Sequence, residues 1–364
     1  MLKGFLDHMR IVPDHRIAGM VTYPLDEVLL TTLVGVVCGA DDWEEIEEVA
    51  TGALDWLRAF LPFENGIATA QTLRKIFRLL DPAALEQGFA AWAASMRPLS
   101  REVIAVDGKT SRGSRQSDGT GALHLVSAYA TEAGLVLGQR AVDGKSNEIT
   151  AIPELLDKLN IKGTIISIDA MGTQTIAARI VEKGADYVLA LKGNQSSLHD
   201  DAKLFFADPV CAATCACEVL DVGHGRIEER LCHAADASWL AERHPEWKGL
   251  RSLAAITAKR IDKKTGAESL ETRFYISSLP PDPKALLDAV RAHWGIENNL
   301  HWTLDVIFDE DRCQTRKDHA PRNFAIIRHV AFNILKADDS KGSMHRKRVR
   351  ASINPDFRTK LFAA

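Results

Sequence analysis

The stretch Val103-Ile104-Ala105-Val106-Asp107-Gly108-Lys109 decides how the middle of the chain folds. Its four apolar residues, three of them β-branched, lead directly into an aspartate. This pattern predicts a buried strand that presents one carboxylate at its C-terminal end. Residues 164–172 repeat the pattern, with a β-rich run that ends at Asp169. Two such strands can place both carboxylates at one edge of a sheet, which predicts a divalent-metal site there.

Alternating strand and helix patterns surround these two aspartates. Because strands and helices alternate, we predict an α/β fold, a mixed sheet with helices on its faces. Strands are predicted at residues 103–107, 122–131, 135–142, 163–169 and 186–191, and helices at 147–159, 173–183 and 195–207. Residues 208 to about 280 break this rhythm and predict a β-rich insertion. Residues 283–308 and 322–337 then return to helix.

The N-terminal residues 1–98 are predicted to form an all-helical domain. Their apolar spacing indicates helices at residues 25–40, 42–61, 69–80 and 82–96. Such a domain is either a helix-turn-helix DNA reader or a module for packing or dimerisation, and the sequence favours neither. The acidic run from Asp41 to Glu48 argues against contact of that face with phosphate.

The charge is distributed unevenly along the chain. The 364 residues carry a net charge of −4, yet from Arg312 onward thirteen Lys and Arg face only four Asp and Glu. This asymmetry predicts a basic surface for a polyanion, with residues 338–364 as a basic C-terminal tail; the alternative is a tail that is merely solvated. The catalytic domain is then expected between residues 99 and 337.

The chain has no features that predict export or membrane insertion. Its start lacks a secretory apolar region, and the longest apolar run, residues 28–40, is too short to span a bilayer. We therefore expect a cytoplasmic protein with free thiols and no membrane partner. Cys211, Cys215 and Cys217 could imitate a zinc cluster, but they lack paired C-x-x-C spacing, which favours unligated cysteines.

A third carboxylate is expected to complete the metal site, and Glu297 is the best candidate. On a helix, His293, Glu297, His301 and Asp305 follow one another at i, i+4 steps, so acid and imidazole groups share a face. The alternative is a solvated polar stripe. The Gly-Lys-Thr sequence at Gly108 lacks the earlier glycine of a phosphate-binding loop, so no nucleotide cofactor is expected.

Four motifs together resemble a known family. They are residues 104–109 (IAVDGK), 169–174 (DAMGTQ), 187–195 (YVLALKGNQ) and 293–298 (HWGIEN), and the likeness covers about residues 5 to 337. In combination they resemble bacterial insertion-sequence transposases, in the H-repeat-associated (ISAs-type) group of the DDE superfamily. The N-terminal helices resemble the associated domain of that group.

The resemblance implies a ribonuclease-H-like core in which Asp107, Asp169 and Glu297 form the catalytic and metal-binding triad. It also implies two Mg²⁺ or Mn²⁺ ions, double-stranded DNA at the transposon ends and the target, and a homodimer on DNA. The protein would associate with the bacterial nucleoid when bound. Our candidates for DNA contacts are Lys109, Lys145, Lys192, Asn194, Gln195, His293, His301, Arg316 and Arg322.

The expected activity is metal-dependent DNA strand cleavage followed by transfer of a 3′-hydroxyl to target DNA. A ribonuclease-H-like nuclease or resolvase without strand transfer is a rival with the same chemistry. A decayed or repurposed, non-catalytic DNA-binding protein is a rival from another class. Loss of one acid would mark that rival, and all three acids are present.

Overall fold

The computed structural model describes residues 2–96, 101–115, 121–142, 148–169, 173–208, 215–223 and 225–363. Its centre is a sheet that begins with three antiparallel strands, β1, β2 and β3, and continues from β1 into the parallel strands β4 and β5. This is the ribonuclease-H-like arrangement that the resemblance implies. The strands are β1 (Val103–Ser111), β2 (Leu123–Ala130), β3 (Leu135–Val142), β4 (Ile165–Ile168) and β5 (Asp186–Leu191).

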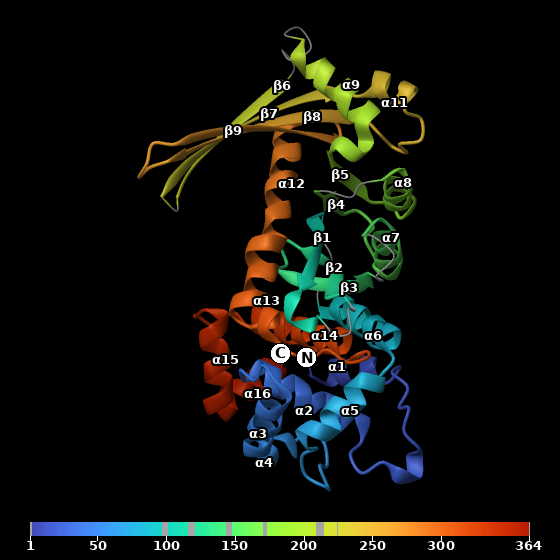
Figure 1. Ribbon diagram of the computed structural model, residues 1–364, viewed down its shortest axis with the longest axis vertical. Helices are drawn as coiled ribbons and strands as arrows, with labels where there is room; N and C mark the ends of the chain where they lie inside the picture. Colours follow the sequence, from blue (N-terminus) through green and yellow to red (C-terminus); the bar gives the residue numbers. More distant parts are fainter. Residues whose placement is uncertain are drawn as a thin grey trace.

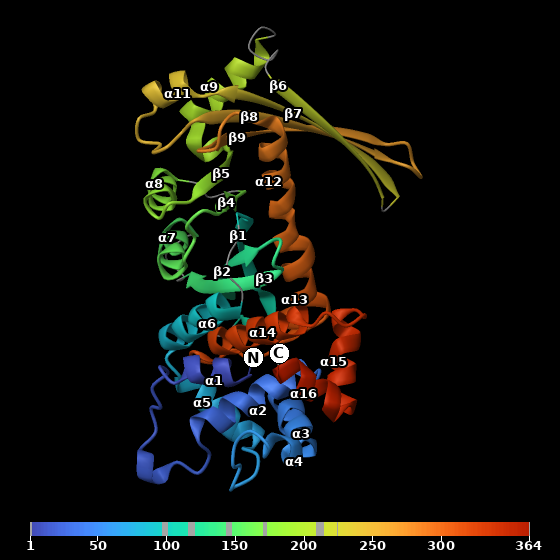
Figure 2. The same ribbon diagram turned by 180° about the vertical axis from the view of Figure 1, so that it is seen from behind.

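Helices cover both faces of this sheet. One face carries α7 (Glu148–Lys158) and α8 (Gln174–Glu182), and α12 (Pro283–Gly295) crosses the other, as Figures 1 and 2 show. Most of the buried residues of these strands are apolar, because helices cover both faces of the sheet. The predicted strands and helices of this core are confirmed, with bounds that differ by a few residues.

The insertion does not form a separate sheet. Strand β9 (Glu268–Ser277) pairs antiparallel with β5, so the whole is one nine-stranded sheet in the order β3-β2-β1-β4-β5-β9-β8-β7-β6. Its other strands are β6 (Cys215–Gly223), β7 (Arg226–Asp236) and β8 (Ser252–Asp262), with α9 (Ser196–Ala207) and α11 (Ser238–Arg243) packed nearby. The β-rich character predicted for residues 208–280 is confirmed in the described part of that segment.

The other end of the elongated molecule is helical (Figure 1). The single helix expected over residues 42–61 is wrong, since the chain breaks at Ala53, whose φ of −105° and ψ of 8° are not helical. Gly52, a poor helix former, precedes the break. The helices are α1 (Leu2–Met9), η1 (Ala18–Met20), α2 (Leu25–Val37), α3 (Trp43–Gly52), α4 (Leu54–Leu57), α5 (Ala70–Leu79) and α6 (Pro82–Met96).

A long helical segment joins the two ends. After α12 the chain passes through a π-helical turn, η4 (Ile296–His301), into α13 (Trp302–Val306). After η5 (Glu310–Arg312), the buried helix α14 (Ala320–Ala337) packs against β3 and the N-terminal helices. The N-terminal helices, η4 and α14 thus share one apolar core. No helix in the described ranges has the length and apolar character to cross a bilayer.

The expected basic tail is not a free segment. Residues 344–353 and 355–363 fold as α15 (Met344–Ile353) and α16 (Pro355–Ala363). The guanidinium of Arg348 is buried, donates to the carbonyls of Val36, Ala40 and Ile307, and lies 2.8 Å from Oδ1 of Asp41. A charge that appears solvated in the sequence therefore fastens α15 to the N-terminal helices, because buried carbonyls and a carboxylate satisfy it.

Candidate metal centre

Asp107 lies in the middle of β1. Residues 103–106 pair in parallel with residues 165–168 of β4, and Asp107 is the first residue beyond this pairing. The strand does not end there, as the sequence suggested, because antiparallel pairing with β2 carries β1 on to Ser111. Asp107 is thus held by a partner strand on one side and open on the other.

Asp169 follows β4 at the equivalent position. Ile168 pairs with Val106, so the two aspartates stand one residue past the same rung of the sheet. Its carboxylate lies 3.5 Å from Nζ of Lys192 and 3.6 Å from a guanidinium nitrogen of Arg273. Asp169 is thus next to Asp107 in register, but two cations engage its side chain.

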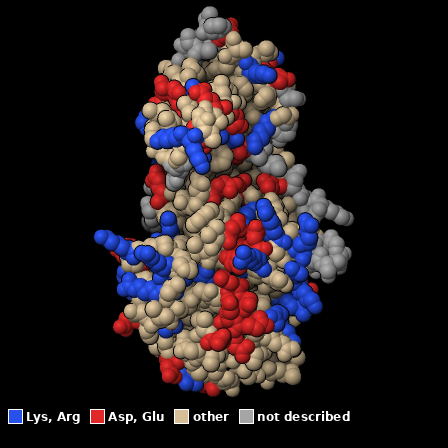
Figure 3. Space-filling model, turned by 60° about the vertical axis from the view of Figure 1, so that its left-hand side comes forward, with Lys and Arg blue, Asp and Glu red and all other residues tan. Residues whose placement is uncertain are grey.

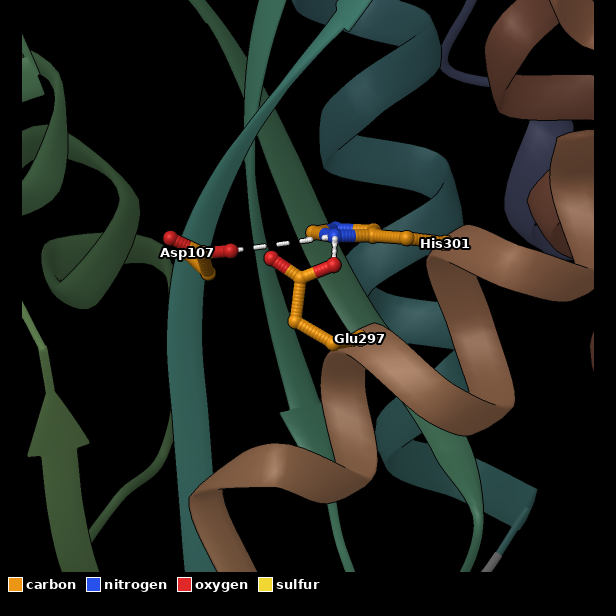
Figure 4. Close-up of side chains that lie close together, drawn as sticks. All are labelled: Asp107, Glu297 and His301. Carbon is orange, nitrogen blue, oxygen red and sulfur yellow. Dashed lines mark ion pairs between the residues drawn. The ribbon is translucent and has the colours of Figure 1, made fainter. Parts of the chain in front are cut away.

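Glu297 comes from the π-helical turn η4. Ile296 and Leu300 are fully buried and anchor this turn on the core. Glu297 is exposed and lies on the side of the turn that faces Asp107 of β1 (Figure 4). Nδ1 of His301 lies 3.3 Å from Oε2 of Glu297 and 3.7 Å from Oδ2 of Asp107 (Figure 4). π-Helical turns occur often at functional sites because they reposition side chains along a helix.

Asp107, Glu297 and His301 form the one group of potential metal ligands found in the described residues. Their ligand atoms lie within 4.8 Å of one another, and Asp169 is not part of this group. Burial, together with the side chain of Glu297, raises the pKa of Asp107 to about 7. Nε2 of buried His301 has no hydrogen-bond partner among the described residues, and burial lowers its pKa, which favours the neutral ring. No Lys or Arg in the described part of the chain pairs with the carboxylates of Asp107 and Glu297, and a divalent cation fits this donor set.

Lys109, a candidate for DNA contact, is engaged by carboxylates in the structure. Its Nζ lies 2.6 Å from Asp305, 2.9 Å from Glu310 and 3.7 Å from Asp311. Burial lowers its pKa, but the charge of Glu310 and the hydrogen bonds outweigh this effect, and the pKa is raised overall. This cluster ties the Asp107 strand to α13 and η5, the segments that follow Glu297.

Two other candidates for DNA contacts also make internal contacts. His293 is buried, and its Nδ1 lies 2.6 Å from the hydroxyl of Ser167 on β4. Arg322 donates from Nε to the buried carboxylate of Glu86 at 2.7 Å. Both side chains hold parts of the core together, although 20% of the Arg322 side chain is exposed.

The remaining candidates differ in exposure. Lys192 and Arg316 are exposed, and Gln195 is half-buried in η3 (Gly193–Gln195). Lys145 and the side chain of Asn194 lie outside the described residues.

The sequence argument missed one pair of residues beside Asp107. Nε2 of His124 lies 2.7 Å from the carboxylate of Glu148, and both groups occupy the space where a side chain at position 108 would stand. Gly108 is therefore required for this close approach. The glycine after Asp107 was the only signal in the sequence, and it gave no indication of which residues would fill the gap.

Comparison with known proteins identifies two family matches. The family model described as "DDE_Tnp_1-associated" matches residues 6–93, and the family model described as "Transposase DDE domain" matches residues 98–334. The chain is 38% identical over its whole length to "Putative transposase YncI" of Escherichia coli O157:H7, covering 95% of that protein. It is equally similar to "H repeat-associated putative transposase YhhI" of Escherichia coli K12, covering 98%. "Inactive transposase YbfQ" matches over 75 residues at 39% identity.

Proposed function

Because this chain belongs to the DDE transposase family, we propose that it cuts DNA at the ends of an insertion sequence and joins them to a target. The substrate is double-stranded DNA, and Asp107, Asp169 and Glu297 hold two divalent ions. The observation that carries the proposal is the convergence of Asp107 and Glu297, from distant parts of the chain, on one imidazole nitrogen.

Bound Mg²⁺ or Mn²⁺ ions would activate the attacking oxygen and stabilise the leaving oxygen of a phosphodiester bond. The residues of the chain hold the carboxylates of Asp107 and Glu297 in position. Asp107 itself pairs with β2, and the residues just before it pair with β4. The Lys109 cluster fixes the segment after Glu297 relative to that strand. His301 holds the Glu297 carboxylate in place from the same turn of helix.

In this proposal Asp169 is the third acid of the triad, and its register with Asp107 supports that role. Among the described residues, Lys192 and Arg273 pair with its carboxylate, at 3.5 and 3.6 Å. If this carboxylate turned toward a bound metal ion, Lys192 would lose its partner and be free to contact a DNA phosphate, whereas Arg273 would still face Glu271 at 2.8 Å. Lys192 would then serve as a counter-ion before DNA binds and as a phosphate contact afterward.

The similarity to a relative named inactive keeps the non-catalytic alternative open to test. A labelled duplex that carries one end of the element is incubated with Mg²⁺ and target plasmid. Cleavage and joining are expected for the wild type, and neither for Asp107→Asn or Glu297→Gln. Cleavage without joining would favour a nuclease, and DNA binding without cleavage would favour a decayed copy.

A further inference from the structure

Two loops that are distant in sequence are locked together beside the Asp107 strand. One is η2 (Arg112–Ser114), which continues β1, and the other runs from η5 to Lys317. A Cβ at Gly113 would collide with the carbonyl oxygens of Cys313 and Asp311, so only glycine permits this contact. The close contact between the two loops therefore depends on the glycine at position 113.

Polar contacts reinforce the junction and connect it to the candidate metal centre. The backbone N–H of Arg112 donates to Asp311 at 3.0 Å, and Nε of Arg316 donates to the carbonyl of Gly113 at 2.9 Å. Asp311 also lies 3.7 Å from Nζ of Lys109. Lys109 follows Asp107 by two residues on β1. The junction is therefore held in a fixed position relative to Asp107.

The junction presents a group of exposed cations, which we name the basic platform. Its members are Arg112, Arg115, Arg312, Arg316 and Lys317. The side chains of Arg112 and Arg312 are 84% exposed, and their carboxylate partners Asp311 and Asp309 lie 3.6 Å away. Exposed pairs of this kind are weak, so a phosphate can replace the carboxylate at little cost.

The other three members of the basic platform, Arg115, Arg316 and Lys317, make no ion pair with any carboxylate in the described ranges.

An acidic surface next to the basic platform limits where a polyanion can lie. A cavity of about 760 Å³ separates part of the platform from the acidic start of α3, where Asp42, Glu44 and Glu45 line the wall. Figure 3 shows an acidic stripe along this face with Lys and Arg on both sides. Phosphates would be repelled by this acidic wall and attracted to the side of the cavity that Arg312, Arg316 and Lys317 line.

We infer that the basic platform binds the phosphate backbone of duplex DNA about five base pairs from the bond that is cut. Arg112 stands about five residues along an extended strand from Asp107, or roughly 16 Å. One strand of duplex DNA advances about 3.4 Å per base pair, so this distance spans about five base pairs. The inference rests on the proposed function, because it takes DNA as the substrate of the Asp107 site.

The test compares two triple variants that remove the same charge. The platform variant is Arg112→Gln/Arg312→Gln/Lys317→Gln. The control is Arg179→Gln/Arg243→Gln/Lys162→Gln, on or near α8 and α11, across the sheet from α12 (Figure 1). In both sets two arginines face a carboxylate and are partly or largely exposed. Binding to a labelled 30-bp duplex without metal is measured between 50 and 300 mM salt.

The platform variant is expected to bind at least roughly tenfold more weakly, with the slope of log K against log salt reduced by about 2 to 3. The control variant should match the wild type. Gly113→Ala, which removes no charge, should also weaken binding because it separates the two loops. Equal binding by the wild type and the platform variant overturns the inference and leaves the proposed function standing. A wild type that does not bind DNA overturns both.

The distance is tested separately with binding to an element end. A neutral methylphosphonate is placed at single positions from two to ten base pairs from the cut. The wild type should lose affinity most steeply near position five, and the platform variant should show no such dependence. Uniform interference along the duplex contradicts the assigned position.

Discussion

The carboxylates of Asp107 and Glu297 meet at the Nδ1 atom of His301, at 3.7 and 3.3 Å. One carboxylate comes from the first strand of the core, and the other from a π-helical turn late in the chain. Burial, and after it the neighbouring side chain of Glu297, raises the pKa of Asp107 to about 7, so the ionised form of Asp107 is disfavoured when no cation is bound. This arrangement is favourable for a cation-dependent site and unfavourable without the cation.

His301 is expected to act as a positioning residue for Glu297. His301→Gln should reduce the rate of Mg²⁺-dependent cleavage roughly 10- to 100-fold, because groups that orient a ligand typically contribute that much. DNA affinity without metal should not change. The Mg²⁺ concentration for half-maximal cleavage should rise.

A matched control exists in His244 of the insertion, which is also buried and lies 2.9 Å from the carboxylate of Asp201 on α9. His244→Gln should retain normal cleavage. If both variants lose activity equally, the effect comes from stability and the assigned role of His301 is wrong.

Lys109 is expected to stabilise the fold through the buried acid Glu310. Lys109→Met removes a cation 2.9 Å from a carboxylate whose side chain is only 2% exposed. Breaking a buried pair in this way costs about 3–5 kcal/mol of unfolding free energy. Urea denaturation of the protein measures the loss.

The double variant Lys109→Met/Glu310→Gln should recover part of this stability, since the uncompensated charge is gone. A loss below about 1 kcal/mol in the single variant would show that nearby Arg328, 3.9 Å from Glu310, compensates the charge.

Asn333 is expected to hold the edge of the sheet against α14. Its side chain accepts from the N–H of Val136 and donates to the Val136 carbonyl, both at 2.8 Å. Asn333→Leu leaves both buried groups without partners and should cost about 2–4 kcal/mol. Thermal unfolding and amide exchange at Val136 measure this. Unchanged exchange at Val136 would contradict the assigned contact.

Asp338 is expected to make the docking of α15 and α16 sensitive to acid. Burial opposes ionisation, but Ser340, Lys360 and Lys347 donate to the carboxylate and hold its pKa at about 2, below the ordinary 3.8. Because the folded-state pKa is the lower one, the stabilisation is present above about pH 4 and is lost as the pH falls toward 2.

The difference in unfolding free energy between the wild type and Asp338→Asn is therefore expected to be roughly 2 kcal/mol near neutral pH. It should shrink as the pH falls from 4. A difference that stays constant over this range would contradict the low pKa.

Local patterns were sufficient to predict the core strands and helices. The runs before Asp107 and Asp169 are short, apolar and β-branched, and they pair in parallel as expected. The extension of β1 to Ser111 was not predictable, because it depends on pairing with β2 and not on the residues of β1 alone.

Long-range ion pairs account for most of what the sequence could not show. Lys109 and Arg322 resemble free cations in the sequence, yet the fold brings Asp305 to the first and Glu86 to the second. Arg348 likewise belongs to a segment with the composition of a tail, and its partners are carbonyls that any residue could supply. Partners of this kind carry no local signal, so only the three-dimensional structure identifies them.

The central claim is that Asp107, Asp169 and Glu297 bind the same pair of ions, and anomalous diffraction from crystals soaked in Mn²⁺ tests it most directly. The account predicts manganese peaks within about 2.5 Å of carboxylate oxygens of Asp107 and Glu297. It also predicts that the carboxylate of Asp169 turns away from Lys192 and Arg273 to join them. Manganese bound elsewhere, or bound at Asp107 and Glu297 while Asp169 keeps its two cation partners, would contradict the account.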